Sequence, residues 1–493
     1  MRQTAVAILV FVLGIGALIA AQFAQPLIFG ADGYLHIRMS RFIAQYGLRC
    51  PFHWARYSVF AQNFADKDFL YHIFLIPFTF FKDIFFGAKV SAAALAVLLY
   101  AVFFWMLRRY CRARFFIPFF LAVFLLSAPF LRALSEPRNM TLVIALTFIF
   151  VHFLLQKRYW TLFALAAVYT LSHVSGPYLI LFTLLAEGTR FASERQFCWQ
   201  AVLATLAGVG AGFLAHPGLP NNLLIFYLNG ILVPIFSLKW GLELGAEFFP
   251  ASTRDWALEY PFILLGLLAL LALSTSAGNR VKTPTKIWMS VAGCFFIFSF
   301  FSRRYLVHLY PLLLVALASY ASDWWESGER LLLLRRHKAI KAAAITLIAG
   351  LLAACGFVTG KSFCRIAQAD QSFNSHYEAA GRWMRENVPA GEIIFHSNWS
   401  DSQYFIGLNP QNDYFVTLDP IFMYYWNPQK YKLYRDISFG STPDPYTLLK
   451  SAFGARFGYA GKNYFSGLVN QVRLDPRFQV LAEDGMGIIF KLN

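Results

Sequence analysis

Charged residues are scarce in this 493-residue chain. Only 14% of its residues are Asp, Glu, Lys or Arg, whereas 58% are hydrophobic. Soluble domains are about a quarter charged, and a water-soluble fold could not hide this much apolar side chain. The composition therefore excludes an ordinary soluble protein and predicts that most of the chain lies in a membrane.

A nucleic-acid recognition motif and a basic soluble domain are also missing, although the formal net charge is +17. The Lys and Arg residues are dispersed between apolar runs instead of gathering along one face. We therefore expect no nucleic-acid partner. Orientation in the membrane and attraction to anionic lipids or phosphate groups explain the positive charge better.

Closely spaced cysteines are absent too, which excludes a zinc-finger type of site and a CxxC redox motif. Cys50 and Cys364 are both expected outside the cytoplasm, where they form either a disulfide or two free thiols. The full set is Cys50, Cys111, Cys198, Cys294, Cys355 and Cys364.

Long apolar runs dominate what is present. Residues 5–21 form the first span, and without the usual small-residue cleavage site we expect an uncleaved anchor. Segment 69–81 is too short to cross ~30 Å of hydrocarbon and predicts a helix at the interface. Ten further spans are predicted at 86–107, 115–131, 139–155, 160–174, 177–187, 197–214, 258–274, 286–301, 305–320 and 342–358.

Basic residues in the short loops indicate the orientation, because cytoplasmic loops carry an excess of Lys and Arg. These loops all fall on one side, which puts the N-terminus in the cytoplasm and, after eleven spans, the C-terminal residues outside. The residues are Arg108, Arg109, Arg112, Arg114, Lys157, Arg158, Arg190, Arg195, Arg280, Lys282, Lys286, Arg330, Arg335, Arg336, Lys338 and Lys341.

The sequence divides into two predicted domains, a membrane domain at 1–358 and an external α/β domain at 359–493. In the second, apolar runs shorten and strand-like segments alternate with helical ones, which favours a partly parallel sheet. Strands are predicted at 392–396, 414–418, 456–460, 478–482 and 487–492, and helices at 376–387, 428–437, 443–453 and 463–473.

The large first external loop, residues 30–85, begins with ionisable residues. Asp32 follows the first span almost directly, and His36 lies four residues on, so a helix would place both on one face. Arg38 comes next. A carboxylate can take a proton from an acceptor hydroxyl, and the basic groups can bind phosphate oxygens. The alternative is a helix-capping aspartate followed by solvated basic residues.

Three other external acids are candidates to work with Asp32. Asp66 and Asp68 have the acid-x-acid spacing that lets two carboxylates reach one divalent cation, although Asp68 could instead cap the next helix. Glu136 is the only acid of the second external loop, between two arginines. It either completes a metal or acceptor site with Asp32 and Asp68 or pairs with an arginine.

Arg303 and Arg304 begin a late span at its external end. Because an arginine at the membrane boundary is costly and tends to be functional, we expect them to bind phosphate, with snorkelling as the alternative. His308 follows on the same span and is a further candidate for substrate binding. His173 and His216 lie at other external span ends. A lone histidine on an apolar helix is more often packed in a core than a ligand.

These features resemble the GT-C superfamily of membrane glycosyltransferases, which includes oligosaccharyltransferase catalytic subunits, protein mannosyltransferases and aminoarabinose transferases. The resemblance rests on the loop pattern DGYLHIR…G…W…DKDFLYHIFLIPF, the Arg303-Arg304-Tyr305 start of a span with Pro311 behind it, and the terminal external domain. The chain also looks like a group of bacterial membrane proteins with the pattern HSNWSDSQYF…LDPIFMYYWNP.

The resemblance implies a multi-pass inner-membrane enzyme that moves a sugar, with inversion, from a polyprenyl-phosphate carrier to an external glycan, lipid or protein. Asp32 matches the first-loop aspartate, which serves as acceptor base or metal ligand. Asp66 and Asp68 would orient the acceptor or a Mg²⁺ or Mn²⁺ ion, unless the enzyme is metal-independent. Arg303 and Arg304, with Arg38, would stabilise the leaving phosphate.

Two departures from oligosaccharyltransferases favour a single-sugar transferase over protein N-glycosylation. The acidic pair of the second loop is reduced to Glu136, and a WWD-type motif is replaced by NWSD at 398–401.

A lipid-glycan flippase or transporter remains a rival, although it should show midplane acids or inverted repeats, and neither is visible. A non-catalytic envelope-glycan assembly protein is another. Its aromatic stretch 422–434 would bind sugar or form the domain core.

Overall fold

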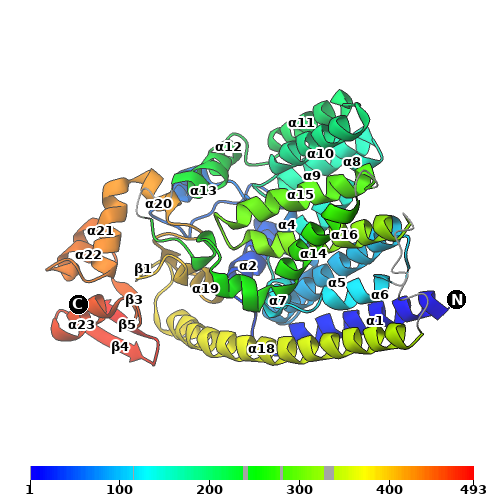
Figure 1. The fold of residues 1–493 in the computed structure, drawn as a ribbon. Coiled ribbons are helices and arrows are strands. Elements are labelled where there is room, and N and C mark those ends of the chain that lie inside the picture. Colours follow the sequence, from blue (N-terminus) through cyan, green and yellow to red (C-terminus); the bar gives the residue numbers. More distant parts are fainter. Residues whose placement is uncertain (1, 115, 237–241, 278–280, 327–337) are drawn as a thin grey trace.

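The computed structural model describes residues 2–114, 116–236, 242–277, 281–326 and 338–493. In Figure 1 a bundle of helices occupies one end of the molecule and the C-terminal strands the other, and α18 runs along one side. The N-terminal half contains α1 (Arg2–Gln22), α2 (Asp32–Tyr46), α3 (Phe60–Asn63), α4 (Phe69–Leu75), η1 (Ile76–Phe80), α5 (Ile84–Tyr110), α6 (Phe116–Val123), α7 (Ala128–Ser135), α8 (Met140–Leu155), α9 (Tyr159–Ser172), α10 (Tyr178–Glu194) and α11 (Trp199–Leu214).

The chain then continues through shorter pieces before the last long helices. Each predicted span coincides with a helix or, in one case, with two helices. These elements are α12 (Asn221–Ile225), η2 (Phe226–Leu232), α13 (Val233–Phe236), η3 (Ala246–Phe248), η4 (Asp255–Glu259), α14 (Pro261–Ala277), α15 (Thr283–Ser299), α16 (Tyr305–Glu326) and α18 (Lys338–Asn387).

The predicted number of eleven spans is not confirmed. By length and composition, four helices in the described ranges can cross a membrane, and they lie at Gln3–Gln22, Ile84–Tyr110, Tyr305–Glu326 and Ile345–Asn387. Several others, such as α8 with 16 residues, rise only about 24 Å, which is less than the ~30 Å hydrocarbon core. The protein is thus a helical membrane protein whose bundle combines long and short helices.

The predicted span at 115–131 is wrong as a single helix. Helices α6 and α7 meet at an angle of 74°, and would be a fifth candidate span only if counted together. Helix α6 ends at Val123, and Ser127 caps α7, because its hydroxyl accepts a hydrogen bond from the Phe130 amide. With Pro129 in the first turn of α7, this is a common way to begin a new helix.

The C-terminal residues form the predicted α/β domain around a five-stranded sheet of order β2-β1-β3-β5-β4. The pairs β1–β2 and β1–β3 are parallel, whereas β3–β5 and β5–β4 are antiparallel, so the prediction of a partly parallel sheet is confirmed. The elements are β1 (Ile393–His396), α19 (Asp401–Leu408), β2 (Asp413–Tyr414), α20 (Ile421–Trp426), α21 (Pro428–Ser438), α22 (Pro445–Phe453), β3 (Phe457–Gly461), α23 (Ser466–Leu474), β4 (Phe478–Glu483) and β5 (Gly487–Leu492).

The first loop packs as part of this domain. Residues 54–57 run parallel to the edge of β2, where the Arg56 amide donates to the Tyr414 carbonyl at 2.8 Å and the Tyr414 amide donates to the Trp54 carbonyl at 2.6 Å. Trp54 and Tyr414 belong to one hydrophobic core, separate from the core of the bundle. The first loop and the C-terminal domain therefore form one packed unit.

The structure leaves several predictions untested. The predicted domain boundary at 358/359 lies within α18, which connects the bundle to the sheet as one helix. Orientation in the membrane also stays a prediction. It rests partly on Arg280, Arg330, Arg335 and Arg336, which lie outside the described residues. Cys50 is buried and Cys364 exposed, and both are free thiols.

Candidate active site

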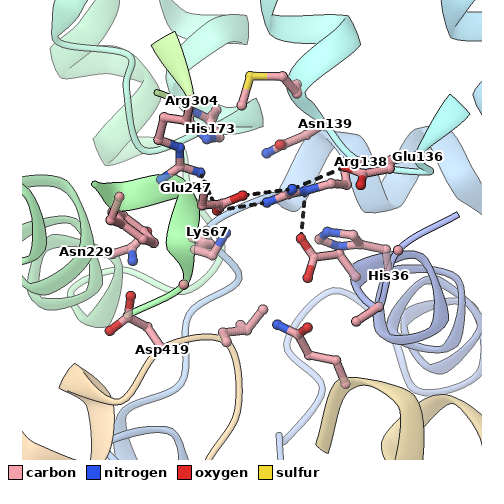
Figure 2. Close-up of a pocket in the computed structure, with 18 of the residues that line it drawn as sticks. His36, Lys67, Glu136, Arg138, Asn139, His173, Asn229, Glu247, Arg304 and Asp419 are labelled. Atoms are coloured by element: carbon pink, nitrogen blue, oxygen red, sulfur yellow. Dashed lines mark hydrogen bonds and ion pairs between the residues drawn. The ribbon is translucent and has the colours of Figure 1, made fainter. Parts of the chain in front are cut away.

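A cavity of about 360 Å³ lies where the bundle, the first loop and the C-terminal domain meet. The first loop contributes Asp32, His36 and Lys67, the bundle contributes Glu136, Arg138 and Arg304 among others, and the C-terminal domain contributes Trp399, Gln403, Leu418 and Asp419. Figure 2 shows His36, Lys67, Arg138, Arg304 and Asp419 converging from segments far apart in the sequence. A cavity lined by so many convergent polar groups is the leading candidate for the functional site.

Arg138 is the centre of an ion cluster in this cavity. Its Nε lies 2.7 Å from Oδ2 of Asp32, and its Nη1 lies 3.2 Å from Glu136 and 3.4 Å from Glu247. Asp32 is the first residue of α2, which starts immediately after the turn at Gly30. Gly30 has a φ of +70°, and a Cβ there would lie 3.0 Å from Glu136 Oε1. One guanidinium thus binds three carboxylates, and the glycine lets them approach.

Asp68 forms a second, more buried ion pair. Lys67 Nζ lies 2.7 Å from its Oδ2, and the side-chain amide of Asn139 donates to its other oxygen. Burial alone would raise the pKa of Asp68, but nearby cationic groups, Lys67 first among them, lower that pKa. Asp68 is therefore an anion that holds Lys67 at the edge of the cavity.

A chain of three buried side chains lies behind the cavity wall. His36 Nδ1 is 2.7 Å from His72 Nε2, and His72 Nδ1 is 2.6 Å from Asp66 Oδ2. The exposed fractions of His36, His72 and Asp66 are 4%, 5% and 8%. The sequence predicted Asp66 and His36 as separate contacts to acceptor and phosphate, whereas the structure joins them through His72.

The predicted metal ligands do not fit a divalent cation in this arrangement. Asp32 and Glu136 are both bound by Arg138, and Asp68 is bound by Lys67 and Asn139. Within the described ranges, no three His, Cys, Asp or Glu side chains form a group that could hold a metal ion. Mg²⁺ and Mn²⁺ need free carboxylate or carbonyl oxygens, and here guanidinium, ammonium and amide groups engage the oxygens of these acids, except one oxygen of Asp32.

The predicted phosphate-binding residues separate into two groups. Arg304 lines the cavity, 3.5 Å from Glu247, with its guanidinium over the Phe248 ring. Its neighbour Arg303 is not part of the lining, and its Nε donates to the Ala246 carbonyl at 3.0 Å. Only one of the two adjacent arginines therefore faces a potential ligand.

Two other predicted residues also lie outside the cavity lining. Arg38 donates to the Gly407 carbonyl at 2.7 and 2.9 Å and so links α2 to α19. His308 is buried and stacks on Phe295, with ring centroids 4.9 Å apart. Arg38 and His308 thus have packing contacts where the sequence predicted contacts to phosphate or substrate.

The C-terminal domain supplies cavity residues that sequence reasoning missed. Asp419 is 2% exposed, its Oδ1 accepts a hydrogen bond from the Ile421 amide, and burial raises its pKa to about 7. Leu418, just before it, has a φ of +68°, an uncommon and strained backbone conformation for a branched residue. Trp399 comes from the NWSD motif. The LDP and NWSD patterns were visible in the sequence, but nothing in them indicated that they meet Asp32.

Comparisons with known proteins identify the fold. No protein-family model matches the chain, and no curated protein sequence matches it. Among solved structures, the oligosaccharyltransferase of Archaeoglobus fulgidus superimposes with a TM-score of 0.63 at 12% identity, covering 92% of this chain and 69% of that one. ArnT from Cupriavidus metallidurans, bound to undecaprenyl phosphate, gives a TM-score of 0.60 at 14% identity, covering 98% of this chain and 97% of that one.

A third match is more distant. The arabinofuranosyltransferase AftD from mycobacteria gives a TM-score of 0.51 at 12% identity, covering 98% of this chain and 40% of that one. All three neighbours are membrane glycosyltransferases of the type that the first-loop pattern resembles, and at these identities the likeness concerns the fold. This chain has the GT-C glycosyltransferase fold.

Proposed function

We propose that this protein transfers a sugar from a polyprenyl-phosphate carrier to an acceptor hydroxyl on the external side of the inner membrane. The observation that supports it best is the convergence of Asp32, Lys67 and Arg304 in one cavity beneath the C-terminal domain. A carboxylate for the acceptor and cations for a phosphate are the groups that this reaction needs. The fold shared with ArnT, whose structure holds undecaprenyl phosphate, adds independent support.

The phosphate would bind between Lys67 and Arg304. Lys67 is tied to Asp68 at 2.7 Å, and Arg304 lies at 3.5 Å from Glu247, so both keep donors for a ligand in the cavity. As the bond between sugar and phosphate breaks, negative charge grows on the phosphate oxygens, and fixed cations stabilise that charge. Figure 2 shows Arg304, Glu247 and Lys67 on the same side of the cavity.

The acceptor would bind at Asp32, which the sequence predicted as acceptor base or metal ligand. Its Oδ2 is bound by Arg138, which leaves the other oxygen to accept a hydrogen bond from a hydroxyl. In the transfer, the acceptor oxygen forms a bond to the anomeric carbon on the face opposite the phosphate, and the carbon–phosphate oxygen bond breaks. This displacement inverts the anomeric carbon and routes no step through a metal.

Transfer by the purified protein in nanodiscs tests this proposal. A panel of radiolabelled undecaprenyl-phosphate sugars would be offered with an envelope acceptor fraction to wild type, Asp32→Asn and Asp83→Asn. Asp83 is a matched control because it lies in the same loop, caps α5 and is not part of the cavity lining; Asn caps helices equally well. We expect transfer by wild type and Asp83→Asn only.

The same assay addresses the rival functions. A flippase would move the labelled lipid across the bilayer without forming a new glycosidic bond, and an assembly protein would bind glycan without turnover. Equal transfer by Asp32→Asn and wild type would remove Asp32 from the mechanism. Movement of intact donor lipid with no transfer to any acceptor would reject the enzyme in favour of a transporter.

A further inference from the structure

The three buried residues behind the cavity wall form an ordered hydrogen-bond chain, Asp66–His72–His36. Asp66 and His72 come from the segment that leads into α4 and from α4 itself, and His36 lies on α2, one turn after Asp32. The two contacts of 2.6 and 2.7 Å are short for nitrogen donors. Figure 2 shows the His36 ring at the cavity, on the side where Arg138 approaches.

When both rings are neutral, the hydrogen-bond partners determine where the protons of the Asp66–His72–His36 chain lie. An ionised aspartate only accepts hydrogen bonds, so Asp66 requires a proton on His72 Nδ1. A neutral His72 then has a lone pair on Nε2, which requires a proton on His36 Nδ1. A neutral His36 consequently carries a lone pair on Nε2. The carboxylate thus determines the tautomer of a histidine two hydrogen bonds away.

The remaining nitrogen of His36 is available to a ligand. His36 lines the cavity, and within the part of the chain that the structure describes its Nε2 has no hydrogen-bond partner. His72, in contrast, has both ring nitrogens engaged. Of these two histidines, only His36 can therefore meet a substrate.

Neighbouring groups keep His36 neutral. Burial lowers its pKa well below the usual histidine range, and the cations Lys67, from the segment before α4, and Arg138, from the bundle, act in the same direction. Asp68 opposes them. The ring of Tyr71 packs edge-on against the His36 ring, with ring centroids 5.3 Å apart, and adds no charge. At neutral pH the ring is therefore a proton acceptor rather than a cation.

We propose that His36 is a catalytic residue that takes the proton from the acceptor hydroxyl, with His72 and Asp66 as positioning residues. This inference rests on the proposed function and divides the work at the acceptor between two groups. Asp32, already bound to Arg138, orients the hydroxyl, and His36 removes its proton.

Atoms and charge balance in this transfer of a proton and a sugar. The acceptor O–H bond breaks, its electron pair forms the bond from oxygen to the anomeric carbon, and the proton goes to His36 Nε2. The bond from the anomeric carbon to phosphate breaks, and its electrons leave with the polyprenyl phosphate. The resulting imidazolium is stabilised through His72 by the charge of Asp66 and afterwards releases its proton to water.

Transfer kinetics separate this role from a structural one. With the donor panel and envelope acceptor fraction, we expect His36→Gln to lower kcat by about 10²–10⁴-fold while donor KM stays near the wild-type value. Added imidazole should restore part of the rate in His36→Gly. His53→Gln is the matched control, because His53 also pairs with an aspartate, at 2.9 Å from Asp413, but is not part of the cavity lining.

Asp66→Asn gives a second readout, the pH–rate profile, which a purely structural role of Asp66 would leave unchanged. Without the anion, protonated His36 loses stabilisation, so its apparent pKa falls and the acid limb of the pH–rate profile should move to lower pH. The plateau rate should fall as well, because an amide can also hold His72 in the wrong tautomer. A His36→Gln enzyme with wild-type kcat, or an unmoved acid limb in Asp66→Asn, would overturn the proposal.

Chemical modification tests the Asp66–His72–His36 hydrogen-bond chain without any sugar donor, so the result stays informative if the proposed function fails. Diethyl pyrocarbonate reacts with unprotonated imidazole nitrogens, and the full-length protein in nanodiscs would be treated and mapped by mass spectrometry. We expect modification of His36 and protection of His72. Modification of His72 at an equal rate, or an unmodified His36, would contradict the hydrogen-bond order on which the proposal depends.

Discussion

Two aspartates of the first loop illustrate how environment divides chemical roles between identical side chains. Asp32 lies at the cavity with its side chain 20% exposed and is bound directly by Arg138. Asp66 is buried and reaches the same cavity only through two histidines. The first carboxylate can touch a substrate, whereas the second can act only through its neighbours.

The side chains that surround Asp32 and Asp66 differ as well. Around Asp32, carboxylates and guanidiniums from three parts of the chain alternate, which suits a site that must bind both a phosphate and a hydroxyl. Around Asp66, the buried rings of His72 and His36 fix the hydrogen-bond directions instead. Four predictions test the Asp32 side of this contrast, beginning with the largest expected effect.

Replacing Arg138, which binds Asp32, should have the largest effect. Arg138→Gln leaves Asp32, Glu136 and Glu247 without their shared cation, so we expect transfer to fall by about 10²–10³-fold, the size seen when a fixed charge or donor is removed from an active site. Thermal unfolding should also begin at lower temperature. Arg382→Gln, which removes an exposed arginine paired with Glu378, should change neither. Transfer within tenfold of wild type would show that the cluster is only structural.

Replacing Arg304 and Arg303 in turn should show that the two adjacent arginines have different roles. Because Arg304 lines the cavity and Arg303 does not, Arg304→Gln should raise the donor KM by about ten- to a hundredfold, the equivalent of one charged hydrogen bond. Arg303→Gln is the matched control and should leave it unchanged. Titration of undecaprenyl phosphate against each variant by tryptophan fluorescence gives the same comparison without turnover. Equal weakening by both would mean that the phosphate lies outside the cavity.

Asp419 should give a smaller, pH-dependent effect. Burial raises its pKa to about 7, so the group is protonated below that pH and becomes an anion above it. The new charge repels a phosphate near Arg304, and we expect donor KM to rise about three- to tenfold between pH 6 and 8, as for ~1 kcal/mol of charge repulsion. Asp419→Asn, which cannot ionise, should flatten that rise. A rise of the same size in the variant would assign it to another group.

Removal of divalent metal should have the smallest effect. Arg138 and Lys67 already neutralise the acids that a metal would need, so EDTA should leave the transfer rate within twofold of the untreated enzyme. Loss of activity with EDTA that Mn²⁺ or Mg²⁺ restores would show that the cations of the protein make way for a metal during turnover.

The sequence was sufficient for much of the fold. Hydropathy placed a helix at each predicted span, and alternating patterns placed five strands, because both signals depend on local burial. The break between α6 and α7 was readable from Ser127 and Pro129, but the continuous apolar run hid it. Strand β2 was too long in the prediction, since the chain leaves the sheet after Tyr414 to pair with the first loop.

The site was only partly predictable. Asp32, His36 and Arg304 stood out because charged groups next to apolar spans are costly, and all three line the cavity. Glu247 and Asp419 gave no such signal, since their role depends on segments that are distant in the sequence. Arg38 had the right chemistry but is directed to the Gly407 carbonyl by the packing of α2 on α19. Spacing cannot reveal contacts of this kind.

The most direct test is the structure of the full-length protein in nanodiscs with undecaprenyl phosphate, determined by electron cryo-microscopy. We predict phosphate density in the cavity between Lys67 and Arg304, with the Arg138–Asp32 pair intact and His36 Nε2 facing the space left for the acceptor. Phosphate bound elsewhere, for example beside Arg382 and Arg385 at the far end of α18, with this cavity empty, would contradict the assignment of the active site.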